Sequence, residues 1–248
     1  MVTTRTGTHD LGYFDSWPAP MYEAMTKLNP CPVINSTTPF YGPLIYTLCR
    51  VIPAYRALEI GVAQGWTSGF MAWAIKENND RHGANGKYYG LDSAPKPEEQ
   101  KAHDALGLPS EFIHCPEGSV AFLEKQTKWE KDSLDLVFID GWHNTDYVRR
   151  ELELVYPLVK DGGRGYILMH DVYATCEQVF REVSKDQRYH FEFVRFLENY
   201  GLAILRKMEN YDDKKIYWPE GDQPHPEGLD MSVATKFKEG MKTAEKMK

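Results

Sequence analysis

Acidic and histidine side chains follow two neighbouring apolar segments in the second half of the chain. Asp140 and His143 come directly after one segment, in the order Asp-Gly-Trp-His, and His170 and Asp171 come directly after the next. If both segments are parallel strands, their carboxyl ends meet at one edge of a sheet, where ligands bind in such folds. Two acids and two histidines at that edge favour a divalent cation held beside a general base. Taken singly, each residue also fits a structural role as a helix cap, a surface loop residue or part of a turn.

A glycine-containing turn lies in the first half of the chain, within the sequence LEIGVAQGWTS that starts at residue 58. An apolar run leads into Gly61 and Gly65, and Thr67 and Ser68 offer side-chain oxygens that can cap a helix. Glycine lets the backbone approach a ligand closely and adopt dihedral angles that other residues avoid. The G-x-x-x-G spacing differs from the G-x-G-x-x-G of pyrophosphate-binding loops. We therefore predict a cofactor-binding loop of another kind, with ordinary turn glycines as the alternative.

Two acids are expected close to this loop. Glu59, two residues before Gly61, would lie on a buried strand, where a carboxylate is costly unless it has a partner. The cationic amine of a cofactor is one candidate partner. Asp92 ends the next apolar segment and is followed by Ser93. An acid at that place can accept hydrogen bonds from both ribose hydroxyls of an adenosine, with a helix cap as the alternative role.

Alternating apolar and amphipathic segments between residues 56 and 207 would position these groups. The predicted strands are residues 57–61, 87–92, 111–115, 134–140 and 165–169. The predicted helices are residues 41–51, 67–77, 97–106, 120–125, 145–158 and 176–185. Two further runs, 191–196 and 201–207, are joined by a turn of sequence Glu-Asn-Tyr-Gly at 198–201 and are predicted to form a hairpin. The expected fold class is α/β, a doubly wound, mostly parallel sheet with a C-terminal antiparallel hairpin. A dinucleotide-binding fold would continue with parallel strands instead.

Two segments flank this domain, which we place at residues 41–207. Residues 1–40 are rich in proline, threonine and aromatic residues and are expected to form an N-terminal arm or lid. Residues 208–248 are polar and end in a lysine-rich helical pattern at 233–248. We interpret them as a C-terminal extension that covers the surface or contacts a partner.

The glycine turn resembles a known family. Residues 58–65 are similar, position by position, to the first motif of the class I S-adenosylmethionine-dependent methyltransferases, hydrophobic-E-hydrophobic-G-x-x-x-G. The resemblance covers roughly residues 40–207 and implies a Rossmann-like fold that binds S-adenosylmethionine. In that family the acid ending the second strand binds ribose, and a region after the third strand contacts adenine. The implied cofactor-binding residues are Glu59, Gly61, Gly65, Asp92, Ser93, Glu117, Gly118, Ser119 and Asp140.

The acid–histidine pattern resembles a subset of that family, the metal-dependent O-methyltransferases that methylate sugar hydroxyls, and the related cephalosporin-hydroxylase-like group. This resemblance implies that Asp140 and Asp171 are metal ligands and that His143 is the base near the acceptor hydroxyl. Catechol-type relatives carry lysine where His143 stands and aspartate-asparagine at the second pair. The chain departs from both groups at His170, which becomes a candidate third ligand. Carboxylates favour Mg²⁺, whereas an added imidazole favours Mn²⁺, Fe²⁺ or Zn²⁺, so a divalent cation, Mg²⁺ or Mn²⁺, is expected.

Three functions follow from these patterns. The leading one is an enzyme that transfers a methyl group from S-adenosylmethionine to a hydroxyl of a small molecule, with His143 as its base. A non-haem metal oxygenase or hydroxylase could use the same histidines and carboxylates, but it would leave the glycine loop unexplained. A non-catalytic module that only binds the cofactor is the third, although no expected cofactor or base position is missing.

The composition limits the partners and the location. A formal net charge of −7 argues against the basic face of nucleic-acid binders. No apolar stretch approaches the length of a membrane span, and the N-terminus lacks a signal-peptide pattern. The scattered Cys31, Cys49, Cys115 and Cys176 fit buried free thiols in a reducing compartment. We therefore expect a soluble, cytoplasmic protein with a small-molecule partner, no nucleic acid and no membrane. Since related sugar methyltransferases are often oligomers, a homo-oligomer is one of the expected states.

Overall fold

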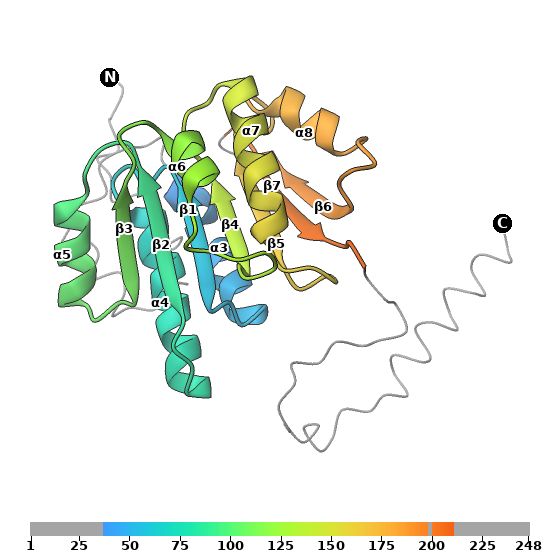
Figure 1. The fold of residues 1–248 in the computed structure, drawn as a ribbon. Coiled ribbons are helices and arrows are strands. Elements are labelled where there is room, and N and C mark those ends of the chain that lie inside the picture. Colours follow the sequence, from blue (N-terminus) through green and yellow to red (C-terminus); the bar gives the residue numbers. More distant parts are fainter. Residues whose placement is uncertain (1–36, 198–199, 211–248) are drawn as a thin grey trace, which may run out of the picture. The chain divides into compact units, whose positions relative to one another are not determined.

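The computed structural model describes residues 37–197 and 200–210. Its centre is one seven-stranded sheet with the strand order β3-β2-β1-β4-β5-β7-β6 (Figure 1). The first five strands pair in parallel, and β7 pairs antiparallel with both β5 and β6. The strands are β1 (Arg56–Ile60), β2 (Lys87–Asp92), β3 (Ser110–His114), β4 (Leu136–Ile139), β5 (Tyr166–His170), β6 (Phe191–Phe196) and β7 (Leu202–Lys207). The predicted fold class, including the C-terminal hairpin, is confirmed.

Helices cover both faces of the sheet, as Figure 1 shows. They are α3 (Thr37–Val51), α4 (Trp66–His82), α5 (Pro97–Ala105), α6 (Ser119–Lys125), α7 (Thr145–Val155) and α8 (Glu177–Val183). One buried cluster joins α3 and α4 to one face of the sheet, and a second joins α6, α7 and α8 to the other. Every residue of β4 is buried, as expected for a parallel strand covered on both faces.

The strand order of the sheet has a switch point between β1 and β4, where successive strands are added on opposite sides. Strands β2 and β3 lie on one side of β1, whereas β4 and β5 lie on the other. Ligands bind at such a switch point because the loops after the two central strands diverge there. Here those loops begin with Gly61 and Asp140, and the backbone N–H of Asp140 donates to the carbonyl oxygen of Ile60 at 2.9 Å.

Several predicted elements have other bounds in the structure, and two of these differences have a clear physical reason. Strand β4 starts at Leu136 rather than 134 because Asp135 turns its carboxylate to the backbone N–H groups of Tyr55 and Arg56, at 2.8 Å each. The helix predicted to reach residue 158 is α-helical only to Val155 and continues as a 3₁₀ turn, Tyr156–Leu158. Pro157 lies in that turn, and its ring removes the N–H that an α-helix would need.

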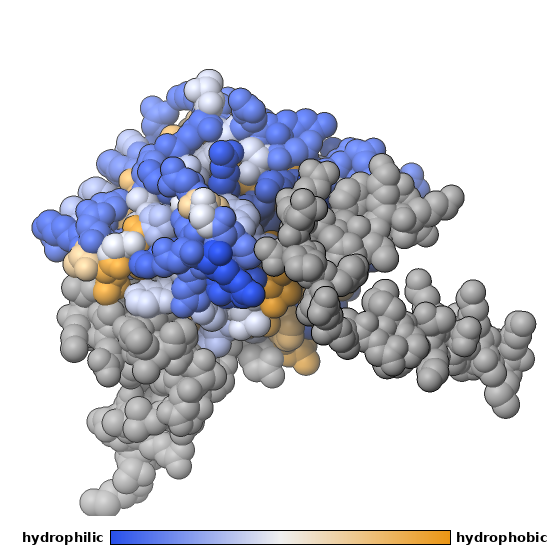
Figure 2. All heavy atoms as spheres, turned by 90° about the horizontal axis from the view of Figure 1, so that it is seen from below, coloured by the Kyte–Doolittle hydropathy of each residue, from blue (hydrophilic) through white to orange (hydrophobic). Residues whose placement is uncertain are grey.

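The ends of the chain lie largely outside the described residues. Helix α3 begins at Thr37, inside the segment expected to be an arm, while residues 1–36 and 211–248, with the predicted helix 233–248, are outside the description. Cys49, Cys115 and Cys176 are buried free thiols, as expected, and Cys31 lies outside. Within the described part of the chain, none of the helices has the length and apolar character needed to cross a membrane. The face drawn in Figure 2 is mostly hydrophilic, with small apolar areas.

Candidate active site

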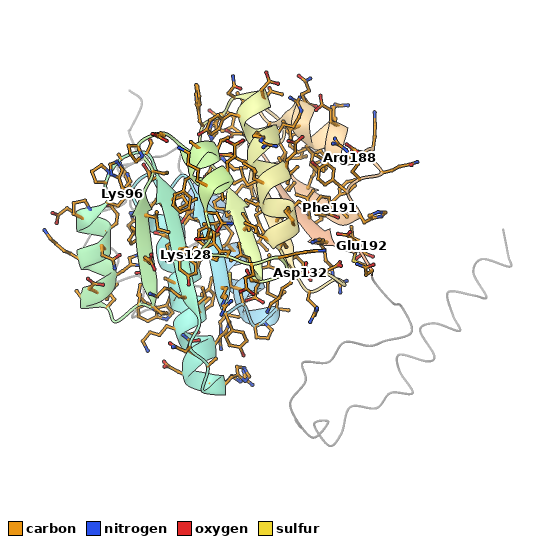
Figure 3. All side chains as sticks on the ribbon, in the orientation of Figure 1. Lys96, Lys128, Asp132, Arg188, Phe191 and Glu192 are labelled. Carbon is orange, nitrogen blue, oxygen red and sulfur yellow. The ribbon has the colours of Figure 1, made fainter. Side chains whose placement is uncertain are left out.

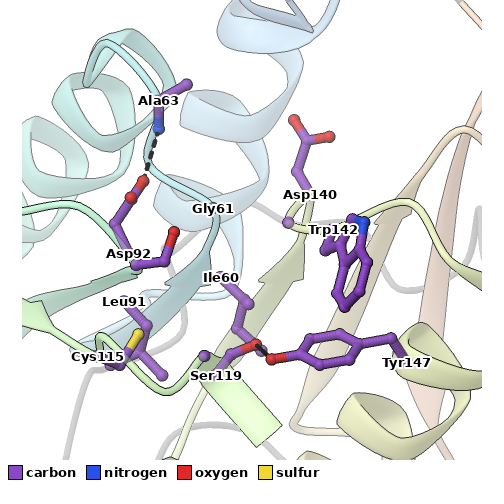
Figure 4. A pocket seen from close by; sticks show the side chains of 13 residues that line it. Ile60, Gly61, Ala63, Leu91, Asp92, Cys115, Ser119, Asp140, Trp142 and Tyr147 are labelled. Carbon is purple, nitrogen blue, oxygen red and sulfur yellow. Dashed lines mark hydrogen bonds between the residues drawn. The ribbon is translucent and has the colours of Figure 1, made fainter.

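A cavity of about 500 Å³ opens at the carboxyl ends of β1, β2 and β4. Figure 4 shows the side chains around it. Six of the residues implied by the family resemblance line it: Gly61, Asp92, Ser93, Gly118, Ser119 and Asp140. The structure therefore brings together loops that are far apart in the sequence, at the switch point of the sheet.

The glycine turn closes one side of this cavity. Gly61 has a φ of 88°, a left-handed conformation, and a Cβ atom there would overlap the carbonyl oxygen of Asp140. Only glycine satisfies both conditions without strain. Gly65 has a φ of 77° and precedes α4, and a Cβ atom on it would lie 2.9 Å from Cγ of Glu99. Gly65 shapes the loop from outside the cavity lining, so its contact with a cofactor stays a prediction.

Glu59 lies beneath the loop and outside the cavity lining. Its side chain is buried, and the hydroxyl of Tyr88 donates a hydrogen bond to its carboxyl group. Burial raises the pKa of Glu59 well above its usual value. The partner that this buried acid requires is thus supplied by the protein itself, and an interaction with a cofactor amine stays a prediction.

Asp92 holds the glycine loop from the end of β2. One carboxylate oxygen accepts hydrogen bonds from the backbone N–H groups of Val62 and Ala63, at 3.1 Å each, and the other accepts from the N–H of Ala94 at 2.9 Å. Lys96, labelled in Figure 3, donates to the carbonyl oxygen of Ala63 at 2.7 Å, and its Nζ lies 3.6 Å from the Asp92 carboxylate. The acid and the lysine together fix the shape of the loop that faces the cavity.

Ser119, Trp142 and Tyr147 form the opposite side of the cavity, shown in Figure 4. The rings of Trp142 and Tyr147 have centroids 5.0 Å apart, and Trp142 is 67% exposed. The two aromatic rings at the cavity mouth offer flat apolar faces against which a planar ligand can pack. Neither aromatic residue was among the predicted site residues, although Trp142 lies between Asp140 and His143 in the sequence. Glu117, in contrast, is outside the lining and pairs with Lys125 at 2.8 Å.

The four residues of the acid–histidine pattern meet next to the cavity, as expected. Oδ1 of Asp140 lies 3.0 Å from Nδ1 of His170 and 3.4 Å from Nε2 of His143. Oδ2 of Asp171 lies 2.7 Å from Nδ1 of His143, and its Oδ1 lies 3.3 Å from Nδ1 of His170. The ends of β4 and β5 therefore bring two carboxylates and two imidazoles into one cluster.

This cluster fits a divalent cation. Asp140, His143 and His170 each offer one ligand atom within 4.8 Å of the others, and mixed imidazole and carboxylate donors suit Mn²⁺, Fe²⁺ or Zn²⁺ as well as Mg²⁺. The group differs from the expected one, because His143 takes the place of Asp171. Asp171 instead contacts both histidines.

The ionisation of His143 differs from that of an unperturbed imidazole. Its hydrogen bonds with Asp140 and then Asp171 raise its pKa to about 10. An imidazole with the ordinary pKa of about 6.5 would be mostly neutral at pH 7. The His143 imidazole instead keeps its proton at that pH, because the Asp140 and Asp171 carboxylates stabilise its charged form. His143 can accept a proton only once a cation or substrate weakens that interaction.

Comparisons with known proteins agree with this architecture. Residues 58–172 match the family model described as a methyltransferase domain. The structure of the methyltransferase PaMTH1 from Podospora anserina, bound to S-adenosylhomocysteine, aligns with a TM-score of 0.61 and 14% identity, covering 84% of this chain and 98% of that one. The O-methyltransferase TomG from Streptomyces achromogenes, in complex with S-adenosylmethionine, aligns with a TM-score of 0.58 and 14% identity, covering 79% and 95%.

A third structure extends the comparison. The O-methyltransferase from Bacillus cereus, in complex with S-adenosylhomocysteine, has a TM-score of 0.57 and 14% identity, covering 76% of this chain and 90% of that one. No curated protein is a significant match to the sequence. At these identities the solved structures establish the fold. Together with the family match, they confirm the resemblance drawn from residues 58–65.

Proposed function

We propose that this chain, a methyltransferase of the class I fold, transfers the methyl group of S-adenosylmethionine to a hydroxyl oxygen of a small molecule. The observation that carries the proposal is the position of Asp140, which lines the cavity and also belongs to the acid–histidine cluster. A cofactor in the cavity and an acceptor at the cluster would then be neighbours. Relatives of the same fold are O-methyltransferases that bind S-adenosylmethionine or S-adenosylhomocysteine.

The lining residues suggest how the cofactor would lie. Asp92 and Ser93 would bind the ribose hydroxyls, because the Asp92 carboxylate stands at the end of β2 beside the cavity. Adenine would lie between the Ser119 side and the rings of Trp142 and Tyr147, whose flat faces suit a purine. The methionine part would then extend past Gly61 toward Asp140.

The cluster would prepare the acceptor. The sulfonium methyl is already activated, so the protein must align donor and acceptor and help to remove one proton. A divalent cation, Mg²⁺ or Mn²⁺, held by Asp140, His170 and Asp171 would supply a lowered pKa for the acceptor hydroxyl. His143 lies within hydrogen-bond distance of Asp171, and its side chain is 41% exposed. A cation that neutralised the carboxylates would lower the pKa of His143, so its proton would leave to solvent. The neutral imidazole would then accept the proton of the acceptor hydroxyl.

The composition of the cluster also favours a second candidate. Two histidines and one carboxylate are the usual ligands of non-haem iron oxygenases, and Asp140, His143 and His170 make up such a set. This function would need no S-adenosylmethionine, so the match of residues 58–172 to a methyltransferase domain weighs against it.

The proposal also includes the expected domain bounds, acceptor class, location and oligomeric state. The catalytic domain spans residues 41–207, residues 1–40 act as an arm or lid over the acceptor, and residues 208–248 form an extension. The acceptor is a small molecule rather than nucleic acid, the location is cytoplasmic, and a homo-oligomer stays among the states to be tested.

A labelled-methyl assay tests the proposed function. The purified chain is incubated with S-adenosylmethionine carrying an isotopic methyl group and a panel of sugars, phenols and other small alcohols, and the products are analysed by mass spectrometry. The proposal expects the label on a hydroxyl oxygen of one acceptor class. Products that gain an oxygen atom in the presence of Fe²⁺ and O₂, with no methyl gain, would favour the second candidate.

A further inference from the structure

A buried acid lies behind the cavity wall on the adenine side. Glu151 of α7 is fully buried, and its carboxylate accepts a hydrogen bond from the hydroxyl of Ser119. The second carboxylate oxygen has no hydrogen-bond partner within residues 37–197 and 200–210. Ser119 itself lines the cavity, so Glu151 is linked to the cavity through the Ser119 side chain.

The acid determines the direction of the Ser119 hydroxyl. A serine hydroxyl has one proton to donate and two lone pairs that accept. The hydroxyl of Tyr147 is also near, 3.3 Å from Oγ of Ser119, and accepts from the backbone N–H of Val120 at 3.3 Å. Because an ionised carboxylate is a much stronger acceptor than a phenol, the Ser119 proton points to Glu151. Oγ of Ser119 can then only accept from a ligand.

The wall around Ser119 leaves little freedom. A Cβ atom on Gly118 would overlap the hydroxyl of Tyr147, so Gly118 lets Tyr147 reach Ser119. Burial raises the pKa of Glu151 to about 7. Above that pH the side chain is ionised and has no proton to donate.

We propose that Glu151 is a positioning residue which makes Ser119 an acceptor for the exocyclic amine of adenine, so that the site selects a 6-amino purine over a 6-oxo purine. The inference rests on the proposed function, since it assumes that S-adenosylmethionine occupies the cavity. A 6-amino group donates a hydrogen bond to Oγ of Ser119. A 6-oxo group would bring a second acceptor to an oxygen whose proton is already committed, and the pair would repel.

Calorimetry with two cofactor analogues tests this role. S-adenosylhomocysteine and its 6-oxo counterpart, S-inosylhomocysteine, are titrated into the protein at pH 8.5, where Glu151 is ionised. The wild type is expected to bind the 6-amino analogue at least about tenfold more tightly, the value of one well-placed hydrogen bond. In Glu151→Gln the amide is a weaker acceptor and can itself donate to Ser119, so this ratio falls by about tenfold.

A matched variant and a second substitution complete the test. Glu153→Gln makes the same change on the same helix, where Glu153 pairs with Arg150 at 3.0 Å, and it leaves the ratio unchanged. If thermal unfolding shows that Glu151→Gln does not fold, Ser119→Ala removes the acceptor directly and lowers the ratio as well. A wild type that binds neither analogue contradicts the proposed function. A wild type that binds both equally, or a variant at Glu151 or Ser119 that keeps the full preference, overturns this inference alone.

Discussion

Gly61 and Asp140 lie in backbone contact, so close that a side chain on Gly61 would overlap the carbonyl oxygen of Asp140. The contact arises from the parallel register of β1 and β4, which pairs Ile60 with Ile139. It joins the first residue of the glycine loop to the first residue of the acid–histidine cluster. The cavity and the acid–histidine cluster, which we propose hold the cofactor and the acceptor, therefore share one wall.

Replacing Gly61 should disrupt this wall. Gly61→Ala introduces both a left-handed alanine and a steric overlap, so we expect at least a tenfold loss of S-adenosylhomocysteine affinity by calorimetry, about 1.4 kcal/mol. Gly83→Ala is the matched control, because Gly83 has a φ of 63° and open space around its Cβ position. It carries only the backbone cost, of order 1 kcal/mol in stability, and keeps its affinity. Equal affinities in the two folded variants would refute the placement of Gly61.

Metal binding should depend on Asp140. Asp140→Asn removes a charge from a cluster whose ligand atoms lie within 4.8 Å of one another. Calorimetric affinity for Mn²⁺ should fall at least tenfold, and activity should disappear in EDTA and return with Mg²⁺ or Mn²⁺. Asp146→Asn is the control, since Asp146 pairs with Arg149 on the surface. Full activity in chelator would contradict the metal requirement while leaving methyl transfer itself intact.

His143 should be needed for turnover more than for binding. If it removes the acceptor proton, His143→Ala should lower the rate by about 10²–10⁴-fold while affinity for S-adenosylhomocysteine stays within a factor of two or so. In the metal-free protein its ring should titrate by NMR near pH 10, because Asp140 and Asp171 stabilise the protonated form. Added Mg²⁺ should lower that midpoint by neutralising the carboxylates. Normal turnover in His143→Ala would mean that the proton leaves by another route.

The buried His103 should make stability depend on acidic pH. Its ring contacts Phe112 and Tyr88, with centroids 4.9 and 6.1 Å away, and burial lowers its pKa to about 4. The unfolded chain binds a proton below about pH 6.5 whereas the folded chain does not. The contribution of His103 to the free energy of unfolding should therefore be complete above pH 6.5. It should fall by about 3 kcal/mol as the pH drops to 4.

Urea unfolding across this pH range provides the measurement. His103→Leu should flatten the profile between pH 6.5 and 4, whereas the exposed His190→Leu should not. An unchanged slope in His103→Leu would show that other groups, such as carboxylates paired with lysine and arginine, cause the acid sensitivity.

Local sequence patterns predicted the fold because each element carries its own signal. The buried run of β4 and the glycines at 61 and 65 are visible in a few consecutive residues, and the antiparallel hairpin follows from two short runs around a turn. Partners separated by many residues carry no such signal. Tyr88, which satisfies Glu59, and Glu151, which orients Ser119, become neighbours only through packing.

The ionisation state of the acid–histidine cluster could not be predicted from local sequence patterns either. The order Asp-Gly-Trp-His places His143 near Asp140, but the contact with Asp171 at 2.7 Å depends on the alignment of β4 with β5. Two carboxylates around one imidazole raise its pKa, so a residue type suited to act as a base starts out protonated.

Cofactor binding by the cavity is the central claim, and calorimetry of S-adenosylhomocysteine with wild type and Asp92→Asn tests it most directly. Asp92 holds the glycine loop through two backbone N–H groups and lines the cavity, where we propose that it binds the ribose. We expect saturable binding to the wild type, at least tenfold weaker binding to Asp92→Asn, about 1.4 kcal/mol, and unchanged binding to the surface variant Asp104→Asn. No binding to the wild type, or equal binding to all three folded proteins, would contradict it.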